Sequence, residues 1–216
     1  MEQTSLRITE IFHSLQGESS TVGLPTVFVR LTGCPLRCHY CDTEYAFYGG
    51  ERKTLAQILD EVAAFATPRV CVTGGEPLAQ KPCLELLTAL CDRGYAVSLE
   101  TAGALSIAEV DPRVVKVMDL KTPASGEAHR NLYENLALLQ SSDQIKFVIC
   151  DRQDYEWARL KLDELSLPER VGEILFSPSH GSLQGKELAE WILEDRLPVR
   201  FQLQLHKLLW NDSPGH

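Results

Sequence analysis

The chain has 216 residues, of which 44% are hydrophobic, so it can form one sizeable core and disorder over most of its length is excluded. Its formal net charge of −9 disfavours a nucleic-acid-binding function, because that function needs a basic surface to displace counterions from phosphates. The N-terminus MEQTSLRITE lacks a signal-peptide pattern, and no window approaches the roughly 18 apolar residues of a membrane span. We therefore expect a cytoplasmic protein that binds neither nucleic acid nor a membrane.

Strand-like and helical segments alternate along the chain. The first strand is expected at 25–32, and a helix follows at 54–66, where Thr54 and Gln57 fit a capping box. Further strands are expected at 69–73, 95–100, 114–120, 144–150, 173–178 and 199–205. Further helices are expected at 83–93, which Gly94 is placed to end, and at 131–140, 155–165 and 186–194.

This alternation predicts parallel strands joined by right-handed crossovers. A closed barrel of eight strand–helix units takes about 250 residues, so the length favours an α/β fold with an incomplete (β/α) barrel of about six to seven mainly parallel strands. A doubly wound open sheet is the alternative. Because we find no internal repeat and no linker, we expect a single domain over residues 1–216. Polar and glycine-rich sequences follow the strands, where both folds place their chemistry: GCPLRCHYCDT, GGEP, ETAG, KTP and SHG.

Three of the seven cysteines form a C-x3-C-x2-C loop: Cys34, Cys38 and Cys41. Thiolates are soft ligands that suit zinc or iron–sulfur clusters, and three of them are one short of the usual four. The shortfall would leave one iron of a four-iron cluster open to another ligand. A zinc site completed by His39 or a distant cysteine is the alternative. The remaining cysteines lie beside apolar residues and are expected in the core: Cys71, Cys83, Cys91 and Cys150.

The cysteine spacing, with Tyr40 directly before the last cysteine, resembles the radical S-adenosylmethionine (SAM) superfamily. The resemblance implies that Cys34, Cys38 and Cys41 hold a [4Fe–4S] cluster whose open iron binds SAM, and that reduction splits SAM into methionine and a 5′-deoxyadenosyl radical. The segments GGEP at 74–77 and SLETAG at 98–103 support it. The SAM-binding residues expected on this resemblance are Tyr40, Asp42, Gly74, Gly75, Glu76, Ser98, Glu100, Lys121 and Ser177.

Four further segments, EIFHSLQGES, CDT, DLKTP and LQLHK, together resemble the 7-carboxy-7-deazaguanine synthase family from about residue 8 to residue 209. The resemblance implies conversion of 6-carboxy-5,6,7,8-tetrahydropterin to 7-carboxy-7-deazaguanine and ammonia, in the pathway to queuosine and other 7-deazapurines. SAM is regenerated and Mg²⁺ assists. The family also implies a homodimer and an electron donor such as flavodoxin or ferredoxin.

The substrate carries a carboxylate and a pterin ring, and several side chains suit them. Arg30 alternates with Val29 and Leu31, so it points into the barrel if those two residues pack against helices, and its guanidinium can bind a carboxylate with a two-point fork. The hydroxyl of Thr43 would share Mg²⁺ with substrate oxygens, as the resemblance implies. Lys146 could equally be a solvated residue. The substrate-binding residues expected are Leu15, Gln16, Gly17, Glu18, Arg30, Thr73 and His206.

Two features depart from the family pattern. Ser19 stands where we associate a glycine with the LQGE loop, and the tail LLWNDSPGH after Lys207 does not align. Two other functions remain open at this point. A glycyl-radical-activating-type enzyme shares the cysteine loop and differs in its protein substrate, whereas a zinc-stapled binding module would be colourless and hold about one zinc.

Overall fold

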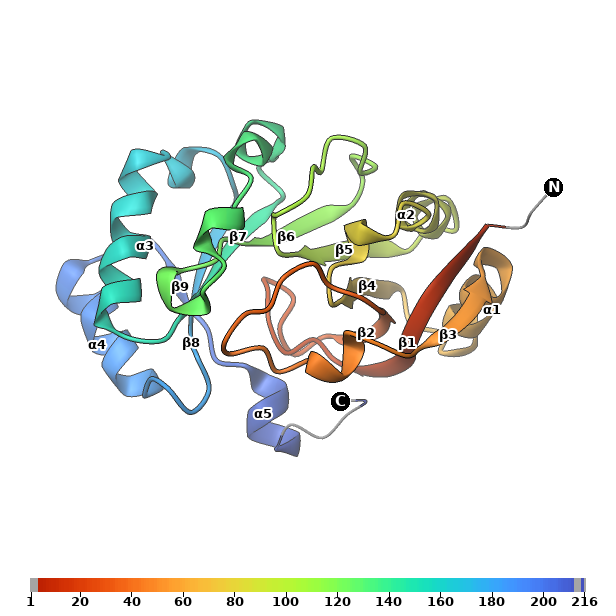
Figure 1. The fold of residues 1–216 in the computed structure, drawn as a ribbon, viewed down its shortest axis with the longest axis horizontal. Coiled ribbons are helices and arrows are strands. Elements are labelled where there is room, and N and C mark those ends of the chain that lie inside the picture. Colours follow the sequence, from red (N-terminus) through yellow and green to blue (C-terminus); the bar gives the residue numbers. More distant parts are fainter. Residues whose placement is uncertain (1–3, 212–214, 216) are drawn as a thin grey trace.

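A computed structural model describes residues 4–211 and 215, and its centre is one nine-stranded sheet in the order β3-β1-β2-β4-β5-β6-β7-β8-β9 (Figure 1). Every neighbouring pair from β2 to β9 is parallel, whereas β1 pairs antiparallel with both β2 and β3. The sheet is open, with β3 and β9 at its edges, which confirms the predicted incomplete barrel. The strands are β1 (Ser5–Leu15), β2 (Pro25–Leu31), β3 (Glu51–Thr54), β4 (Arg69–Gly74), β5 (Ala96–Thr101), β6 (Val115–Asp119), β7 (Gln144–Ile149), β8 (Glu173–Pro178) and β9 (Arg200–Phe201).

The helices α1 and α2 lie at one end of the sheet and α3 and α4 at the other (Figure 1). The predicted capping box is confirmed, since the Gln57 backbone N–H donates to Thr54 Oγ1 at 3.3 Å and the Thr54 N–H donates to Gln57 Oε1 at 2.8 Å. The α-helices are α1 (Leu55–Ala64), α2 (Cys83–Asp92), α3 (Arg152–Glu164), α4 (Gly185–Asp195) and α5 (Leu205–Trp210). The 3-10 helices are η1 (Glu44–Ala46), η2 (Pro77–Ala79), η3 (Pro123–Ser125), η4 (Ala128–Arg130), η5 (Tyr133–Leu138) and η6 (Leu167–Glu169). None of the helices in the described part of the chain has the length and apolar character needed to cross a membrane.

The structure differs from the expected elements in three places. The strands β1 and β3 were not predicted. Only Leu6 and Ile8 of β1 are buried, so most of that strand shows no alternation of buried and exposed residues, and β3 has four residues with none buried. The expected helix at 131–140 is the 3-10 helix η5, since the Asn135 amide donates to the Gly103 and Leu105 carbonyls and ties the segment to a neighbouring loop. The expected strand at 199–205 is only β9, and α5 begins at Leu205.

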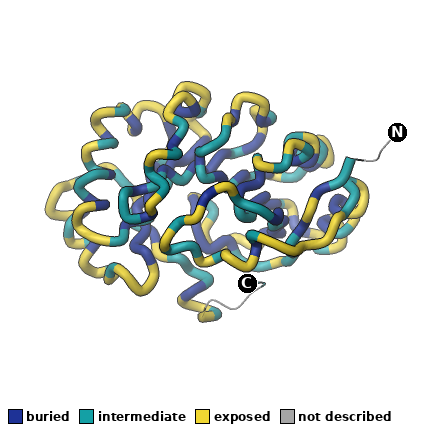
Figure 2. Tube along the Cα trace, viewed as in Figure 1, coloured by how far each residue is buried: buried dark blue, intermediate teal, exposed yellow. Residues whose placement is uncertain are grey.

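The core lies between the sheet and the helices. One cluster packs β1, β2, β4 and β5 against α1 and α2, and a second packs β6, β7 and β8 against α3 and α4. Figure 2 shows that buried residues are concentrated in the strands and that most exposed residues lie in the outer helices and loops. Val27, Val29 and Leu31 of β2 belong to the first cluster, so the alternating residues Phe28 and Arg30 face the other side of the sheet.

Candidate active site

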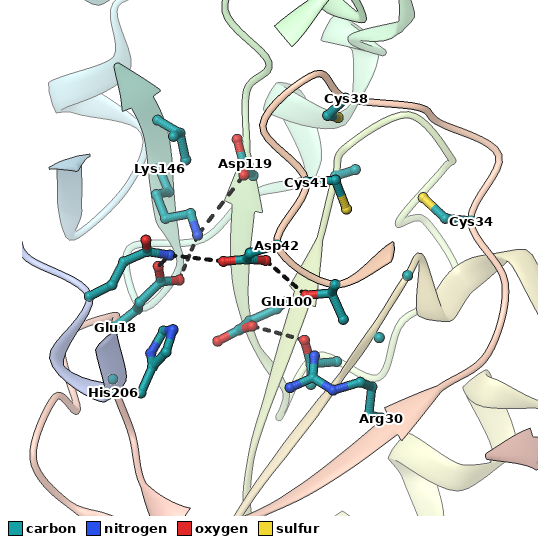
Figure 3. A pocket seen from close by; sticks show the side chains of 18 of the residues that line it. Glu18, Arg30, Cys34, Cys38, Cys41, Asp42, Glu100, Asp119, Lys146 and His206 are labelled. Atoms are coloured by element: carbon teal, nitrogen blue, oxygen red, sulfur yellow. Dashed lines mark hydrogen bonds and ion pairs between the residues drawn. The ribbon is translucent and has the colours of Figure 1, made fainter. Parts of the chain in front are cut away.

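A pocket of about 260 Å³ opens at the carboxyl ends of the parallel strands, where an α/β fold is expected to place its chemistry (Figure 3). Its walls come from the loop after β1, the long cysteine loop after β2, the ends of β4 to β7, and the segment that leads into α5. Parallel strands bring these distant segments together because all their carboxyl ends meet at one edge.

The cysteine loop is held in shape by bonds to its own backbone and to the 123–127 segment. Arg37 Nη1 donates to the Cys34 carbonyl at 2.8 Å, and the Arg37 N–H donates to Glu127 Oε1 at 2.7 Å. Gly33 begins the loop with a φ of +98°, a conformation that glycine adopts without strain. Cys34, Cys38 and Cys41 all line the pocket and are partly buried (Figure 3).

This geometry fits a multi-iron cluster better than a single zinc ion. His39 lies outside the pocket lining, and its Nδ1 is 3.2 Å from the Ala124 carbonyl oxygen. Across residues 4–211 and 215, no three His, Cys, Asp or Glu side chains are arranged to hold one metal ion. A structural zinc draws its ligands to within about 2.3 Å of one centre, whereas each cysteine of a four-iron cluster binds its own iron.

Burial raises the pKa of all three thiols, and that of Cys38 to about 11. Each therefore holds its proton at neutral pH in the absence of a bound cation. Thiolate is the form that ligates metals, so binding of iron displaces these protons.

Beside the thiols, two buried polar atoms have no hydrogen-bond partner among the described residues. These atoms are Tyr40 Oη and Asp119 Oδ1, and both residues line the pocket. Lys121 lies between them, with Nζ 2.8 Å from Asp119 Oδ2 and 5.8 Å from the centre of the Tyr40 ring. A buried polar atom without a partner costs about 1–3 kcal/mol, so these atoms fit a site that a polar ligand such as SAM completes.

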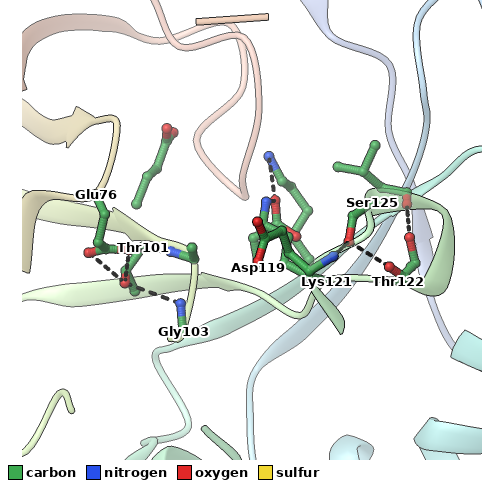
Figure 4. A network of polar contacts seen from close by, with 12 residues as sticks. Glu76, Thr101, Gly103, Asp119, Lys121, Thr122 and Ser125 are labelled. Atoms are coloured by element: carbon green, nitrogen blue, oxygen red, sulfur yellow. Dashed lines mark hydrogen bonds and ion pairs between the residues drawn. The ribbon is translucent and has the colours of Figure 1, made fainter. Parts of the chain in front are cut away.

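The GGEP segment at the end of β4 acts through packing and through one buried carboxylate. A Cβ at Gly74 or Gly75 would overlap the backbone of Leu31 or Gly33, so the two glycines let this segment lie against the cysteine loop. The Glu76 carboxylate accepts from the Thr101 hydroxyl at 2.9 Å and from the Ala102 N–H at 2.7 Å (Figure 4). Glu76 is fully buried and ties the end of β4 to the end of β5.

The opposite wall of the pocket is built from paired charges. Lys146 Nζ is 2.6 Å from Glu18 Oε2 and 4.0 Å from Asp119 Oδ2, and Gln204 Nε2 donates to Glu18 Oε1 at 2.8 Å (Figure 3). Burial raises the pKa of Glu18, but Lys146 more than offsets this effect and leaves it below its ordinary value. Glu18 is therefore an ionised acceptor at neutral pH.

Three further contacts organise the floor of the pocket, around Glu100 and Arg30. Glu100 accepts from the Thr73 hydroxyl at 2.9 Å and from Gln16 Nε2 at 3.4 Å. Arg30 lies on the same floor, and its Nε donates to Glu10 Oε1 at 2.7 Å. The condition for an inward-facing Arg30 is met, because Val29 and Leu31 pack against helices.

The C-terminal segment closes one side of the pocket. His206 lies directly against Gly17, where a Cβ would overlap its ring, and Lys207 Nζ is 3.0 Å from Asp42 Oδ2. Burial raises the pKa of Asp42, but Lys207 outweighs it and holds that pKa well below its usual range. Gly215 also lines the pocket, whereas residues 212–214 and 216 of the tail lie outside the described residues.

The cysteine loop and the strand ends match a known superfamily, since the model of the radical SAM superfamily covers residues 28–119. A 7-carboxy-7-deazaguanine synthase from Chlorobaculum tepidum is 46% identical over 217 residues, which cover 99% of this chain and 98% of that protein. The chain belongs to the 7-carboxy-7-deazaguanine synthase family. A second synthase of the family, from Koribacter versatilis, is 45% identical and covers 95% of this chain and 97% of its own length. The crystal structure of QueE from Escherichia coli shares the fold, with a TM-score of 0.77 at 22% identity over 94% of this chain and 95% of that one.

Membership of the synthase family confirms the radical SAM assignment. Radical SAM enzymes use a [4Fe–4S] cluster and SAM, and the three thiols and the unpartnered polar atoms of this pocket fit both groups. The zinc-stapled module and the glycyl-radical-activating-type enzyme are thereby set aside.

The structure brings most of the site residues predicted for the synthase together in this pocket. Those that line it are Leu15, Gln16, Gly17, Glu18, Arg30, Cys34, Cys38, Tyr40, Cys41, Asp42, Thr43, Thr73, Gly74, Gly75, Glu100, Lys121 and His206. Three predicted SAM-binding residues do not line it: Glu76, Ser98 and Ser177. Ser177 Oγ is buried near the end of β8 and has no hydrogen-bond partner in the part of the chain that the structure describes. Their roles, like those of the lining residues, stay predictions.

Sequence reasoning missed several lining residues of the synthase pocket. Lys146 was left open as a solvated residue, yet only 13% of its side chain is exposed. Its partner Glu18 is 128 positions away in the sequence, so no local pattern indicated the pair. Phe12 was missed because β1 was not predicted. Gln204 and Lys207 flank His206 in the LQLHK segment, and that signal could have found them.

Proposed function

We propose that the protein converts 6-carboxy-5,6,7,8-tetrahydropterin to 7-carboxy-7-deazaguanine with loss of ammonia, in queuosine and 7-deazapurine biosynthesis. One observation carries the proposal. A single pocket joins the three-thiol loop to an inward-facing guanidinium, in a chain 46% identical to a protein named for this product. The first feature suits radical chemistry and the second suits a carboxylated substrate.

Cys34, Cys38 and Cys41 would hold the cluster, with Tyr40 and Lys121 beside the SAM that binds it. When bound there, the cluster and SAM would supply the radical chemistry that hydrogen-atom removal from the pterin requires. The thiols are partly buried in the pocket, and the Tyr40 and Asp119 polar atoms beside them are buried, which limits the access of bulk water to this chemistry.

Arg30 binds the substrate carboxylate, and Glu18 and Gln16 bind the edge of the pterin ring. Among the described residues, Glu18 Oε1 and Oε2 each accept one hydrogen bond. A carboxylate oxygen has two lone pairs, so each oxygen can also accept from one ring N–H. Because Lys146 keeps Glu18 ionised, Glu18 accepts rather than donates. This requirement selects a ring edge that presents adjacent N–H donors, as an aminopyrimidine does.

Thr43 is the residue we assign to Mg²⁺. Its hydroxyl donates its proton to Asp42 Oδ1 at 2.8 Å, which leaves the lone pairs of Oγ1 free for the cation. Mg²⁺ takes few oxygen ligands from protein and completes its shell with substrate oxygens and water. Lys207 holds Asp42 in place, and His206 lies on the same side of the pocket beside Gly17.

We further propose a cytoplasmic homodimer of single-domain subunits that receives electrons from a flavodoxin or ferredoxin. The cluster cysteines are partly exposed, which gives a protein donor access to the cluster. The sheet has two open edges, β3 and β9, and an open edge is a surface that a second copy can cover. The one continuous sheet supports treatment of the chain as one domain.

An anaerobic assay of the reconstituted protein tests the reaction. It contains reductant, SAM, Mg²⁺ and 6-carboxytetrahydropterin, and mass spectrometry follows the product. We expect 7-carboxy-7-deazaguanine to form, with no net loss of SAM. Cleavage of SAM without this product would retain the radical SAM class and reject the substrate. Omission of SAM and the Cys38→Ala variant serve as controls.

A further inference from the structure

Arg30 does not lie in the pocket unsupported, because Glu10 of the neighbouring strand binds it. The two residues are register partners in the antiparallel pair β1 and β2. Arg30 Nε is 2.7 Å from Glu10 Oε1, and only 15% of the Arg30 side chain and 21% of the Glu10 side chain are exposed. Glu10 thus occupies the inner end of the guanidinium.

Tyr45, in the 3-10 helix η1, completes this support. Its hydroxyl donates to the same Glu10 Oε1 at 2.8 Å. The guanidinium carbon of Arg30 lies 5.7 Å from the centre of the Phe12 ring and 5.9 Å from that of the Tyr45 ring. Burial raises the pKa of Tyr45 to about 12, so the phenol stays a neutral donor in the physiological range. One carboxylate and two rings therefore fix the plane of the guanidinium.

The terminal nitrogens of Arg30 are left for a ligand. In the described part of the chain, the Nε atom is the one that makes a protein hydrogen bond, and Nη1 and Nη2 make none. A guanidinium has five N–H donors, so four remain on these two nitrogens, and two of them form a parallel fork that matches a carboxylate. The fork formed by Nη1 and Nη2 lies at the end of the guanidinium remote from Nε. A carboxylate bound there would therefore not lie beside the Glu10 oxygen, which occupies the Nε side.

We propose that Glu10, together with Tyr45, is a positioning residue that aims the Arg30 fork and so sets the preference of the enzyme for a 6-carboxylate over a neutral 6-substituent. The proposal rests on the proposed function and deepens it, since it explains how the same pocket chooses among pterins. An arginine side chain loses rotamer entropy when it binds a ligand. Because Glu10 already fixes Arg30 before the substrate arrives, this entropic cost is removed from the binding step.

The test measures kcat and KM for two substrates, 6-carboxytetrahydropterin and its neutral 6-carboxamide analogue, in wild type and in Glu10→Ala, Glu10→Gln and Tyr45→Phe. Removal of one bond to a charged group changes affinity by about 10- to 100-fold. We expect Glu10→Ala to raise KM for the carboxylate by about that factor while the value for the carboxamide changes little. Glutamine keeps an acceptor oxygen at the same reach, so Glu10→Gln should restore most of the discrimination.

The Tyr45→Phe variant should lower the discrimination by only a few-fold, roughly the effect of one neutral hydrogen bond. Tyr48→Phe is the matched control, because Tyr48 is 73% exposed and its hydroxyl contacts Arg37 rather than Glu10. The cluster absorbance and circular dichroism of each variant check that the holoenzyme has formed.

Two results would overturn the inference. The first is that, in Glu10→Ala, the ratio of KM for 6-carboxytetrahydropterin to KM for its 6-carboxamide analogue stays at the wild-type value. The other is a Glu10→Gln variant as impaired as Glu10→Ala, since orientation through the acceptor oxygen would then be excluded. Failure of the proposed function is distinct, because wild-type enzyme would itself make no product from the carboxylate.

Discussion

The two ends of the pocket differ in how their polar groups are satisfied. At the end that carries Arg30 and Glu18, Arg30 is bound to Glu10, and Glu18 to Lys146 and Gln204. At the cysteine end, the thiols hold their protons, and Tyr40 Oη and Asp119 Oδ1 are buried without a hydrogen-bond partner among the described residues. The protein therefore builds the Arg30 end from its own charges, whereas the cysteine end fits cofactors that complete it.

This difference has a physical basis. Ion pairs can fix side chains before a substrate arrives, and such preorganisation removes an entropic cost from binding. Within the described residues, the three thiols and the Tyr40 phenol form no ion pair of this kind, so their geometry depends on the group they bind. Substitutions at the cysteine end should consequently cause loss of the cofactors, whereas substitutions at the Arg30 end should cause loss of stability or of substrate specificity.

The largest effect is expected from Cys38→Ala, which removes a cluster ligand. The variant should contain no intact four-iron cluster and should neither cleave SAM nor make product. Cys91→Ala is the control, because Cys91 lies on α2 outside the pocket. Iron and sulfide content, visible absorbance and SAM cleavage measure the outcome. A Cys38→Ala protein with full iron and activity would contradict the ligand assignment.

Lys146→Met should cause the next largest change, because it leaves the buried Glu18 carboxylate without its cation. Removal of one partner from a buried ion pair costs about 3 kcal/mol or more at neutral pH. Thermal unfolding of the cofactor-free protein measures this loss. The exposed pair of Lys186 and Glu190 supplies the control, and Lys186→Met should change stability by less than about 0.5 kcal/mol.

The same pair predicts a dependence on pH. The folded-state pKa of Glu18 lies below its ordinary value of 4.5, so the stability that the pair contributes is present above that pH and is lost as pH falls through the lower folded value. In Lys146→Met, burial and the nearby Asp42 carboxylate both act to raise the pKa of Glu18, and the hydrogen bond from Gln204 opposes them. The difference in melting temperature between wild type and variant should therefore shrink as pH falls. It shrinks first as the variant binds a proton at Glu18 above pH 4.5, and then as wild type loses the contribution of the pair below that pH. A difference that stays constant with pH would show that the loss is not electrostatic.

Thr101→Val should have a smaller effect, of about 1–3 kcal/mol, because it removes the hydroxyl that donates to the buried Glu76 carboxylate without changing the volume much. Since Glu76 ties the GGEP segment to β5, the affinity for SAM should also fall. Equilibrium unfolding and SAM binding to the reconstituted protein report the two effects. Thr88→Val, at an exposed position on α2, is expected to change stability by less than about 0.5 kcal/mol.

The smallest effect is expected from Tyr40→Phe in the cofactor-free protein. It removes a buried hydroxyl that has no hydrogen-bond partner within residues 4–211 and 215, so stability should stay the same or rise by up to about 1 kcal/mol. Tyr155→Phe is the matched comparison, since that hydroxyl donates to Asp195 Oδ2 at 2.7 Å, and its loss should cost about 1–2 kcal/mol. Equal destabilisation by both substitutions would contradict the view that the Tyr40 hydroxyl waits for a cofactor while the Tyr155 hydroxyl is already satisfied.

The local signals in the sequence were sufficient for much of the fold. The capping box of Thr54 and Gln57, the parallel strands from β2 to β8 and the C-x3-C-x2-C loop were all predicted, because each depends on neighbours within a few residues. Asn135 shows where this reasoning ends. Its amide binds the carbonyls of Gly103 and Leu105, some 30 positions away, and the expected helix there is a 3-10 segment instead.

The sequence by itself determined the family, the radical chemistry and the alternation that puts Arg30 on the opposite face from Val29 and Leu31, since motif spacing and strand alternation are local properties. Which of the two faces lines the pocket depended on where the helices pack. Only the tertiary structure decided which groups satisfy one another: Glu10 with Arg30, Lys146 with Glu18, and Lys207 with Asp42. Charged side chains pair with whatever the fold brings within about 4 Å, and no rule of spacing along the chain encodes that partner.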